Sequence, residues 1–425
     1  MAEEKKMPSG TNSVLVVGGG MSGLSAAVEA AEVGYEVFIV EKNPYLGGRV
    51  AQMNKYFPKL CPPYCGLEIN FRRIKDNNRI RFFTCAEVEN VSGQRGDYDV
   101  TIRLNPRYVN ENCTSCGECV KVCPVERDND FNFGMDKSKA IYLPHELSFP
   151  MRYAIDMDAC LGEECGKCVA ACKYDAIELG MTSSTFNLKV ASIIWATGWE
   201  PYDASKIDNL GFGQYPNIIT NMMMERLASV NGPTQGKILR PSDQKEINSI
   251  AFVQCAGSRD ENHLPYCSYI CCMASLKQAT YVREQYPDAN IYIFYIDLRA
   301  PGRYEKFLKN VEADDKVTFI KGKVAKVTED PETGNITVEA EDAVSGRKIQ
   351  KTVEMVVLAT GMVPSAANIT LPEELKVDEN GFIVDGLKDG GMFAVGCAKK
   401  PVDVVSCVED STGAALKAIQ TMVRR

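Results

Sequence analysis

The chain contains 17 cysteines, and eight of them form two runs between residues 113 and 172. The first run is Cys113-x2-Cys116-x2-Cys119-x3-Cys123 followed by Pro124, and the second is Cys160-x4-Cys165-x2-Cys168-x3-Cys172. These spacings are typical of [4Fe–4S] ligands, where three cysteines of a run hold one cluster and the fourth holds the other. The predicted ligand sets are therefore Cys113, Cys116, Cys119 and Cys172 for one cluster, and Cys160, Cys165, Cys168 and Cys123 for the second.

The first run matches the spacing of bacterial ferredoxins, including the proline. The second run departs from it, with two extra residues after Cys160 and Lys173 where proline is usual. A pair of zinc ribbons is the alternative, but zinc needs only four cysteines per metal and no Cys-Pro ending. The residues thus favour two cubanes.

A second motif lies near the N-terminus, where the apolar strand expected at 13–17 leads into a Gly-x-Gly-x-x-Gly turn at 18–23. An Ala-rich helix is expected at 24–33 and a second strand at 36–40, which Glu41 follows. In a dinucleotide-binding fold, Gly18 permits the turn, Gly20 lets the backbone approach the pyrophosphate, and Gly23 lets helix and strand pack. Glu41 is expected to bind the ribose hydroxyls, whereas a Gly-rich turn that binds nothing is the alternative.

The glycine pair Gly47–Gly48, with Arg49 after it, resembles the FAD-binding proteins that have two dinucleotide-binding domains. Ala196-Thr197-Gly198 follows a strand expected at 191–195, and 391–396 resembles the C-terminal FAD motif, with a helix expected at 410–422 whose N-terminus faces the flavin ring. The predicted cofactor is FAD. Its predicted binding residues are Gly18, Gly20, Met21, Ser22, Gly23, Glu41, Lys42, Gly48, Arg49, Val88, Ala196, Thr197, Gly198 and Gly396.

Because FAD motifs stand on both sides of the two cysteine runs, the runs form an insert in a flavin fold. The predicted class is α/β: a two-dinucleotide-binding-domain, thioredoxin-reductase-like flavoprotein with an inserted bacterial-ferredoxin-like double [4Fe–4S] domain. The predicted segments are a polar tail (1–12), the N-terminal portion of the FAD-binding domain (13–104), the insert (105–180), the FAD-domain return and connection (181–245), a degenerate nucleotide-binding-like domain (246–360) and the C-terminal portion of the FAD-binding domain (361–425).

The strand expected at 247–253 begins that second nucleotide-binding-like domain. An NAD(P)H site needs a Gly-x-Gly-x-x-Gly after this strand, but the chain has Gln-Cys-Ala-Gly-Ser-Arg at 254–259. Three more cysteines precede the helix expected at 273–285. A third [4Fe–4S] cluster is predicted on Cys255, Cys267, Cys271 and Cys272, although cysteine is often simply buried and the adjacent pair is awkward for one cluster.

Composition excludes some classes of protein. The net charge of −8 argues against a nucleic-acid-binding protein, and no apolar run is long enough to span a membrane. The N-terminus lacks the apolar core of a signal peptide. Because the cysteines occur at metal-ligand spacings and not in a small secreted domain, we expect a reducing cytoplasm.

Taken together, the Gly-Gly-Gly-x-x-Gly turn, the double ferredoxin motif and the Gln-Cys-x-Gly-Ser-Arg segment resemble the A subunit of heterodisulfide reductase (HdrA). The compact length is similar to its relative in the quinone-interacting membrane-bound oxidoreductases of sulfate reducers (QmoA). That resemblance implies an electron-transfer subunit between menaquinol and adenylylsulfate reductase. The implied partners are a second HdrA-like flavoprotein and a haem-bearing membrane quinone subunit, which would hold the chain on the inner face of the cytoplasmic membrane.

Two alternatives are a soluble, flavin-bifurcating subunit of the HdrA type and a stand-alone NAD(P)H-dependent flavin disulfide reductase. No catalytic residue is predicted on the chain itself, because the cofactors carry the chemistry. Three alternative roles are open for Cys61 and Cys65: a redox dithiol, an electron-transfer or ligand pair, and structural residues. His145 and His263 are expected to be structural, and Met222–Met224 are expected in the core.

Overall fold

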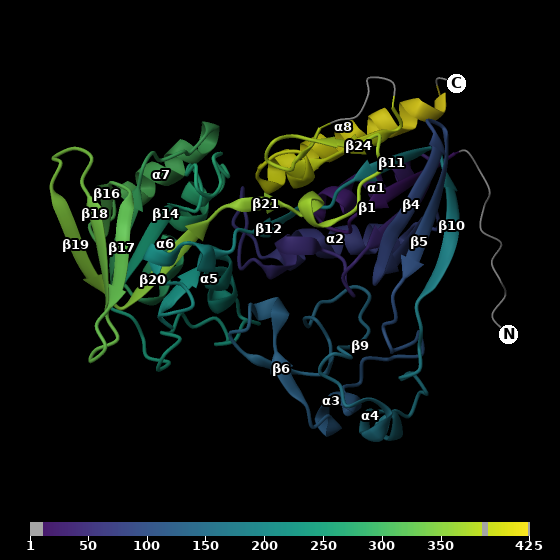
Figure 1. Cartoon of the computed structure of the whole chain (residues 1–425), viewed down its shortest axis with the longest axis horizontal. Helices are drawn as coiled ribbons and strands as arrows, with labels where there is room; N and C mark the ends of the chain where they lie inside the picture. The colour runs from purple at the N-terminus through teal and green to yellow at the C-terminus, as the bar shows by residue number, and fades with distance from the viewer. Residues whose placement is uncertain (1–11, 385–389, 424–425) are drawn as a thin grey trace.

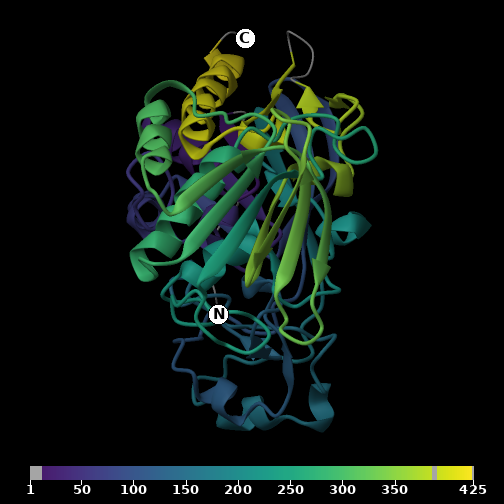
Figure 2. The same ribbon diagram turned by 90° about the vertical axis from the view of Figure 1, so that its left-hand side faces the viewer.

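The computed structural model describes residues 12–384 and 390–423, so the predicted tail at 1–12 lies outside it except for Asn12. Two α/β units lie side by side, and the insert extends below them, on the side opposite the C-terminal helix (Figure 1). A second view places the insert again at the end far from the C-terminal helix (Figure 2). The predicted α/β flavoprotein fold with an insert is confirmed.

The first unit is built on a parallel five-stranded sheet in the order β24-β11-β1-β2-β3. Alternate residues of β1 face opposite sides. Val14 and Val16 pack on the helix side, whereas Leu15 and Val17 pack against a second, antiparallel sheet in the order β10-β5-β4. The strands are β1 (Ser13–Val17), β2 (Glu36–Glu41), β3 (Ile80–Thr84), β4 (Ala86–Gln94), β5 (Asp97–Leu104), β10 (Ser184–Val190), β11 (Ser192–Trp195) and β24 (Met392–Ala394). The helices are α1 (Met21–Glu32), α2 (Pro63–Asp76) and α8 (Val404–Val423).

The second unit repeats this layering with a parallel sheet in the order β13-β20-β14-β15-β16. Ile250 and Phe252 of β14 face the helices, and Ala251 and Val253 face the antiparallel sheet β17-β18-β19. The strands are β13 (Ile218–Thr220), β14 (Ser249–Ala256), β15 (Asn290–Tyr295), β16 (Val317–Lys321), β17 (Val324–Glu329), β18 (Ile336–Glu341), β19 (Lys348–Val353) and β20 (Met355–Thr360). The helices are α5 (Asn221–Ala228), α6 (Cys271–Gln285) and α7 (Glu305–Glu312).

The two units are joined by a pair of short antiparallel strands, β12 (Trp199–Pro201) and β21 (Met362–Pro364). Each strand follows one of the two Ala-Thr-Gly sequences, at 196–198 and at 359–361. The chain therefore crosses between the units at equivalent points of the repeated pattern. A small hairpin of β22 (Lys376–Val377) and β23 (Ile383–Val384) follows the second crossing.

The insert lies between β5 and β10, and its main core is a cluster of five buried apolar residues, around which six of the cysteines pack. Two short helices, α3 (Glu118–Val122) and α4 (Lys167–Ala171), each begin after a glycine in the left-handed region, Gly117 (φ 82°) and Gly166 (φ 53°). Its strands are β6 (Glu126–Asp128), β7 (Lys137–Lys139), β8 (Ile141–Tyr142) and β9 (Ala154–Ile155). A core this small needs additional cross-links, and metal clusters can supply them.

Two local predictions are corrected by the structure. The segment 181–245, expected to be the FAD-domain return and connection, also contains β13 and α5 of the second unit, and β13 pairs with β20 at the edge of the second sheet. The C-terminal helix, expected from Asp410, begins at Val404. The predicted core position of the methionine run is confirmed for Met222 and Met224, which are buried.

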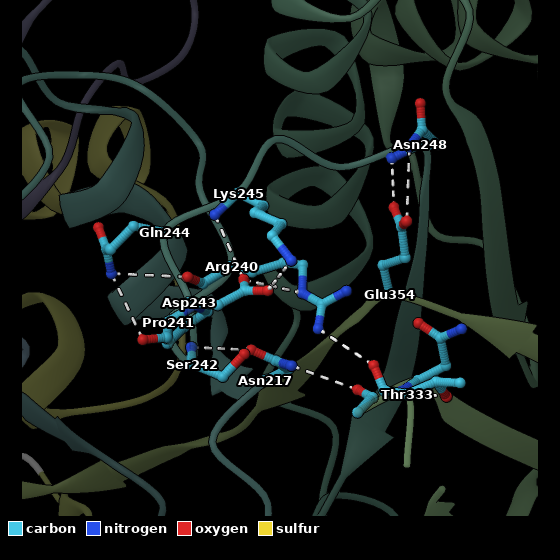
Figure 3. A network of polar contacts seen from close by, with 12 residues as sticks. Asn217, Arg240, Pro241, Ser242, Asp243, Gln244, Lys245, Asn248, Thr333 and Glu354 are labelled. Carbon is cyan, nitrogen blue, oxygen red and sulfur yellow. Dashed lines mark hydrogen bonds and ion pairs between the residues drawn. The ribbon is translucent and has the colours of Figure 1, made fainter.

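A polar network closes the loop before β14 against the β17–β18 turn (Figure 3). The Asn217 amide donates to the Gly334 carbonyl (3.3 Å) and accepts from the Ser242 amide (3.1 Å). Arg240 donates to the Thr333 carbonyl and pairs with Asp243. These contacts fix the loop that leads into the second sheet.

Candidate cofactor and iron–sulfur sites

A cavity of about 600 Å³ lies between the carboxyl ends of β1, β2 and β11, the N-terminus of α8 and the side of α6. Ligands bind at this edge of parallel α/β sheets. Twelve of the predicted FAD-binding residues line the cavity: Gly18, Gly20, Met21, Ser22, Glu41, Lys42, Gly48, Arg49, Val88, Ala196, Thr197 and Gly198. The remaining two, Gly23 and Gly396, lie outside the lining.

The glycines of the first turn have different roles. Gly18 has φ +109°, and a Cβ there would lie 2.3 Å from the Ala196 carbonyl oxygen. A Cβ on Gly23 would lie 1.9 Å from the Gly18 carbonyl oxygen, so Gly23 lets α1 approach β1. A Cβ on Gly20 would meet nothing closer than the Gly48 Cα at 3.8 Å, although Gly20 lines the cavity. Gly20 therefore leaves room for a ligand at the N-terminus of α1.

Glu41 ends β2 with a buried carboxylate. One oxygen accepts from the Gly19 amide (2.7 Å), and the other accepts from the backbone amide (2.8 Å) and side-chain amide (2.7 Å) of Asn43. Burial raises the pKa of the Glu41 carboxyl, and the hydrogen bonds from Asn43 and Gly19 oppose that rise. The carboxylate is thus held at the cavity wall, next to the glycine turn.

The second glycine pair lies directly against the first turn. The Gly47 amide donates to the Gly19 carbonyl (2.8 Å), and Gly48 has φ +55° with Gly20 alongside. Arg49 pairs with Glu200 of β12 and donates to the Trp199 carbonyl (3.3 Å). Burial lowers the pKa of the Arg49 guanidinium. Arg49 therefore ties the cradle to the crossing between the two units.

Two buried polar atoms on the cavity wall lack a protein partner. The Trp195 indole nitrogen and the Thr197 hydroxyl find no hydrogen bond anywhere in the described part of the chain. Buried polar groups are normally paired. Together with the open side of Gly20, these unpaired atoms indicate that the residues fit a bound FAD.

The N-terminus of α8 also reaches the cavity through Val402, Asp403, Val404 and Cys407. A helix N-terminus facing the flavin was predicted from the sequence, but the helix was expected to begin at Asp410, and it begins at Val404. Cys397, which follows Gly396, lines the cavity as well. Gly396 is held by Asp410, whose carboxylate accepts from the Gly396 amide (2.9 Å).

Sequence reasoning missed a buried ion pair at the cavity. Lys277 of α6 lines the cavity and lies 3.1 Å from the Glu225 carboxylate of α5, with both side chains almost fully buried. Glu225 also accepts from Gln278 (2.7 Å), from Tyr281 (3.3 Å) and from the Asn54 amide (3.0 Å). The presence of Lys277 among apolar residues of α6 was the one sequence signal that could have indicated this ion pair.

The cysteines of the insert form two neighbouring groups. Burial, together with the neighbouring Cys113 and Cys116, raises the pKa of the Cys119 thiol to about 12. Burial also raises the pKa of the Cys168 thiol, whose cysteine neighbours are Cys160 and Cys123. This grouping of Cys123 with the second run is the crossing that the sequence predicted. The structure places Cys172 in the same small core.

Backbone amides already point at some of these sulfur atoms. Cys160 accepts from the Gly162 amide and Cys172 from the Ala176 amide, both at 3.4 Å. Such hydrogen bonds are among the factors that set cluster potentials. Within residues 12–384 and 390–423, no three His, Cys, Asp or Glu side chains are arranged for a single metal ion. A cubane needs a wider arrangement, because each thiolate binds a different iron.

The four predicted ligands of the third site also come together. Cys255 lies near the end of β14 with φ +57°, and Cys271 and Cys272 begin α6. Burial raises the pKa of Cys255 to about 11, and its thiol neighbours are Cys272 and Cys267. Burial likewise raises the pKa of Cys271, whose neighbours are the other three. The adjacent pair therefore does not prevent all four thiols from gathering.

The two other cysteines and the two histidines considered in the sequence have no evident chemical role at the cavity. Cys61 is partly exposed and Cys65 exposed, and neither is among the described residues that line the cavity. His145 stacks on Phe131 with ring centroids 4.7 Å apart, and burial lowers its pKa to about 4. The His263 ring shares a hydrogen bond with the Tyr202 hydroxyl (2.8 Å).

The fold and the site define an FAD-dependent oxidoreductase that carries an iron–sulfur domain. A family profile for FAD dependent oxidoreductases matches residues 13–62, and one for a 4Fe-4S binding domain matches residues 106–126. The chain is similar to the A subunits of heterodisulfide reductases. One relative is the iron-sulfur A subunit of the CoB–CoM heterodisulfide reductase of Methanocaldococcus jannaschii, which is 38% identical over 419 residues. The alignment covers 95% of this chain and 63% of that protein.

A second relative is the A subunit of the H2:CoB-CoM heterodisulfide,ferredoxin reductase of Methanothermobacter marburgensis, 36% identical over 97% of this chain and 64% of that protein. The chain thus spans less than two thirds of the length of these relatives. Among solved structures, the thioredoxin reductases of T. acidophilum and Lactococcus lactis each share 14% identity and a TM-score of 0.53. They cover 97% of this chain, with 99% and 100% of their own lengths matched, which shows the fold alone.

No helix in the described ranges combines the length and apolar character needed to cross a membrane.

Proposed function

We propose that the chain is the flavin and iron–sulfur electron-transfer subunit of a heterodisulfide-reductase-type complex, with three [4Fe–4S] clusters. The observation that carries this proposal is the position of α6. Cys271 and Cys272 begin this helix, and Met273, Ala274 and Lys277 of the same helix line the FAD cavity. A cluster at the start of α6 would therefore lie directly beside the flavin site.

The second unit supports electron transfer through this cluster and not through a nicotinamide. In an NAD(P)H site, backbone amides after the first strand face the phosphates. Here the Leu264 amide donates to the Gly257 carbonyl (2.9 Å), and the Arg259 amide donates to the Tyr266 carbonyl (3.0 Å). A Cβ on Gly257 would lie 2.6 Å from the Tyr202 ring. The loop is thus filled by its own chain, and α6 begins well after it.

Bound FAD exchanges two electrons, and cubanes pass them singly. The insert is anchored to the second unit through Arg226 of α5, whose guanidinium donates to Asn132 of the insert (2.7 Å) and stacks over Phe131. Gln52, on the cavity wall, donates to the Phe131 carbonyl (3.1 Å). These buried contacts would hold the insert at a fixed distance from the flavin.

Anaerobic mixing with NADH or NADPH tests the proposal against a stand-alone flavin disulfide reductase. We expect no stoichiometric loss of the oxidised flavin absorbance within the mixing time. Dithionite serves as the control that the flavin is reducible. Stoichiometric bleaching by either nicotinamide would contradict the proposal.

The partners are a separate part of the proposal. The relatives are heterodisulfide reductase subunits, so they favour a complex of that type over the quinone-linked complex of sulfate respiration. The quinone-linked version would place the chain on the inner face of the cytoplasmic membrane with a second flavoprotein, a haem-bearing quinone subunit, and adenylylsulfate reductase as electron partner. Anaerobic purification from solubilised native membranes, with mass spectrometry of what remains bound, separates the two. Cysteine-rich soluble subunits support the heterodisulfide-reductase type, and a haem-bearing membrane protein contradicts it.

A further inference from the structure

Two cysteines outside the proposed cluster sites face each other on the wall of the FAD cavity. The sulfur atoms of Cys397 and Cys407 lie 3.8 Å apart, and both side chains are buried. Both residues line the cavity. They come from different elements, because Cys397 lies in the short helix η8 (Gly396–Ala398) and Cys407 lies in the first turn of α8.

The surrounding backbone holds the two cysteines together. The Asp410 carboxylate of α8 accepts from the Gly396 amide (2.9 Å), which ties α8 to the residue before Cys397. Gly396 has φ +60°, and a Cβ there would lie 3.1 Å from the Cys407 sulfur. A disulfide needs its sulfur atoms about 2.05 Å apart. Bringing them from 3.8 Å to that distance requires a movement of under about 2 Å, which side-chain rotation can share between both residues.

The two thiols have different environments. The Cys397 and Cys407 thiols share a hydrogen bond that lowers the pKa of Cys407, burial opposes this effect, and a hydrogen bond from the Ser22 hydroxyl adds to it. The N-terminus of the 20-residue helix α8 also favours a thiolate at Cys407. The hydrogen bond with Cys407, followed by burial, raises the pKa of Cys397. One thiol is therefore prepared to be the nucleophile, and the other keeps its proton.

We propose that Cys397 and Cys407 form a redox-active dithiol–disulfide pair that exchanges two electrons with the bound FAD. In the oxidising direction both S–H bonds break, one S–S bond forms, and two electrons and two protons pass to FAD, which becomes FADH2. In the reverse direction FADH2 reopens the disulfide. The pair gives the chain a two-electron store beside the cavity, in addition to its one-electron clusters.

This pair differs from Cys61 and Cys65, for which a redox role was considered from the sequence, because neither of those residues lines the cavity. It also does not depend on the partners or on the third cluster, because it needs only FAD and this chain. Failure of the partner proposal would leave it standing.

Differential alkylation of the FAD-loaded full chain tests the pair directly. The protein is poised anaerobically at a series of potentials with mediators, denatured in acid, blocked with N-ethylmaleimide, reduced, and labelled with heavy N-ethylmaleimide. We expect the Cys397 and Cys407 peptides to gain the heavy label together. The oxidised-to-reduced ratio should change tenfold per about 30 mV, as for a two-electron couple. Both cysteines remaining in the first label at potentials where FAD is fully oxidised would overturn the proposal.

Reductive titration gives a second readout. Cys407→Ser and Cys397→Ser should each take up two electrons fewer per FAD than the wild type. Cys85→Ser, a buried cysteine outside the cavity lining, should leave the uptake unchanged and is the matched control. An electron uptake in both variants equal to that of the wild type would overturn the proposal, and the alkylation experiment stands even if a variant fails to fold.

Discussion

Replacing Gly20 with alanine is expected to weaken FAD binding without destabilising the FAD-free protein. Gly20 has ordinary extended angles (φ −78°, ψ −176°), and its Cβ would meet no protein atom closer than 3.8 Å. Gly→Ala at a compatible position stabilises by about 0.4–1 kcal/mol through the unfolded chain. The new methyl group would, however, enter the space at the N-terminus of α1 where the pyrophosphate is expected to lie.

The magnitude follows from the hydrogen bonds that the methyl group would break. A hydrogen bond to a charged group contributes about 1.5–3 kcal/mol, so losing one weakens FAD binding by about 10- to 150-fold. Gly23→Ala is the contrasting variant. Its Cβ would lie 1.9 Å from the Gly18 carbonyl oxygen, so we expect a loss of folding stability of about 1–3 kcal/mol or more.

The assay is titration of FAD-depleted protein with FAD, followed by flavin fluorescence, together with urea unfolding of the same FAD-free samples. Gly413→Ala, at an exposed position of α8 with open space around it, is the control for an alanine substitution alone. Wild-type FAD affinity in Gly20→Ala would refute the assignment of this turn to the pyrophosphate.

Two further predictions concern buried charge. The pKa of His145 is lowered to about 4, so the unfolded chain binds the proton more readily between about pH 4 and 6.5. The contribution of His145 to the free energy of unfolding is complete above that window and falls with decreasing pH, by about 1.5 kcal/mol from pH 6.5 to 5. In urea unfolding, His145→Phe should lose this pH dependence. An unchanged dependence of the unfolding free energy on pH would contradict the prediction. Lys277→Met leaves Glu225 buried without its cation and should cost about 3–5 kcal/mol of unfolding free energy. The double variant Lys277→Met/Glu225→Gln should recover much of that loss, and equal stability of single and double variants would show that the ion pair is not coupled.

Long apolar runs and glycine turns made most of the fold predictable from the sequence. β1 and β2 were expected within a residue of their observed bounds, because each is a buried parallel strand with a nearly continuous apolar sequence. β13 was missed because a three-residue strand carries little pattern of its own. It is a strand because it pairs with β20.

The site was predictable where spacing fixes chemistry and unpredictable where packing does. The glycine turn and the cysteine runs are local in sequence, so their roles follow from short motifs. The meeting of Lys277 with Glu225, and of Cys397 with Cys407, depends on how helices pack in three dimensions. The early start of α8 was missed although Asp403 is a favoured N-cap residue, and its carboxylate accepts from the Ser406 amide (2.8 Å). That first turn brings Cys407 to the cavity.

The iron content per FAD of the anaerobically purified protein tests the central claim, that three clusters accompany one flavin, most directly. We expect about twelve irons per FAD, as three cubanes of four. The variant Cys271→Ser/Cys272→Ser should fall to about eight while keeping its FAD, and Cys85→Ser should stay at about twelve. A wild-type count of about eight that the double variant leaves unchanged would contradict the third cluster and, with it, the proposed route of electrons through α6.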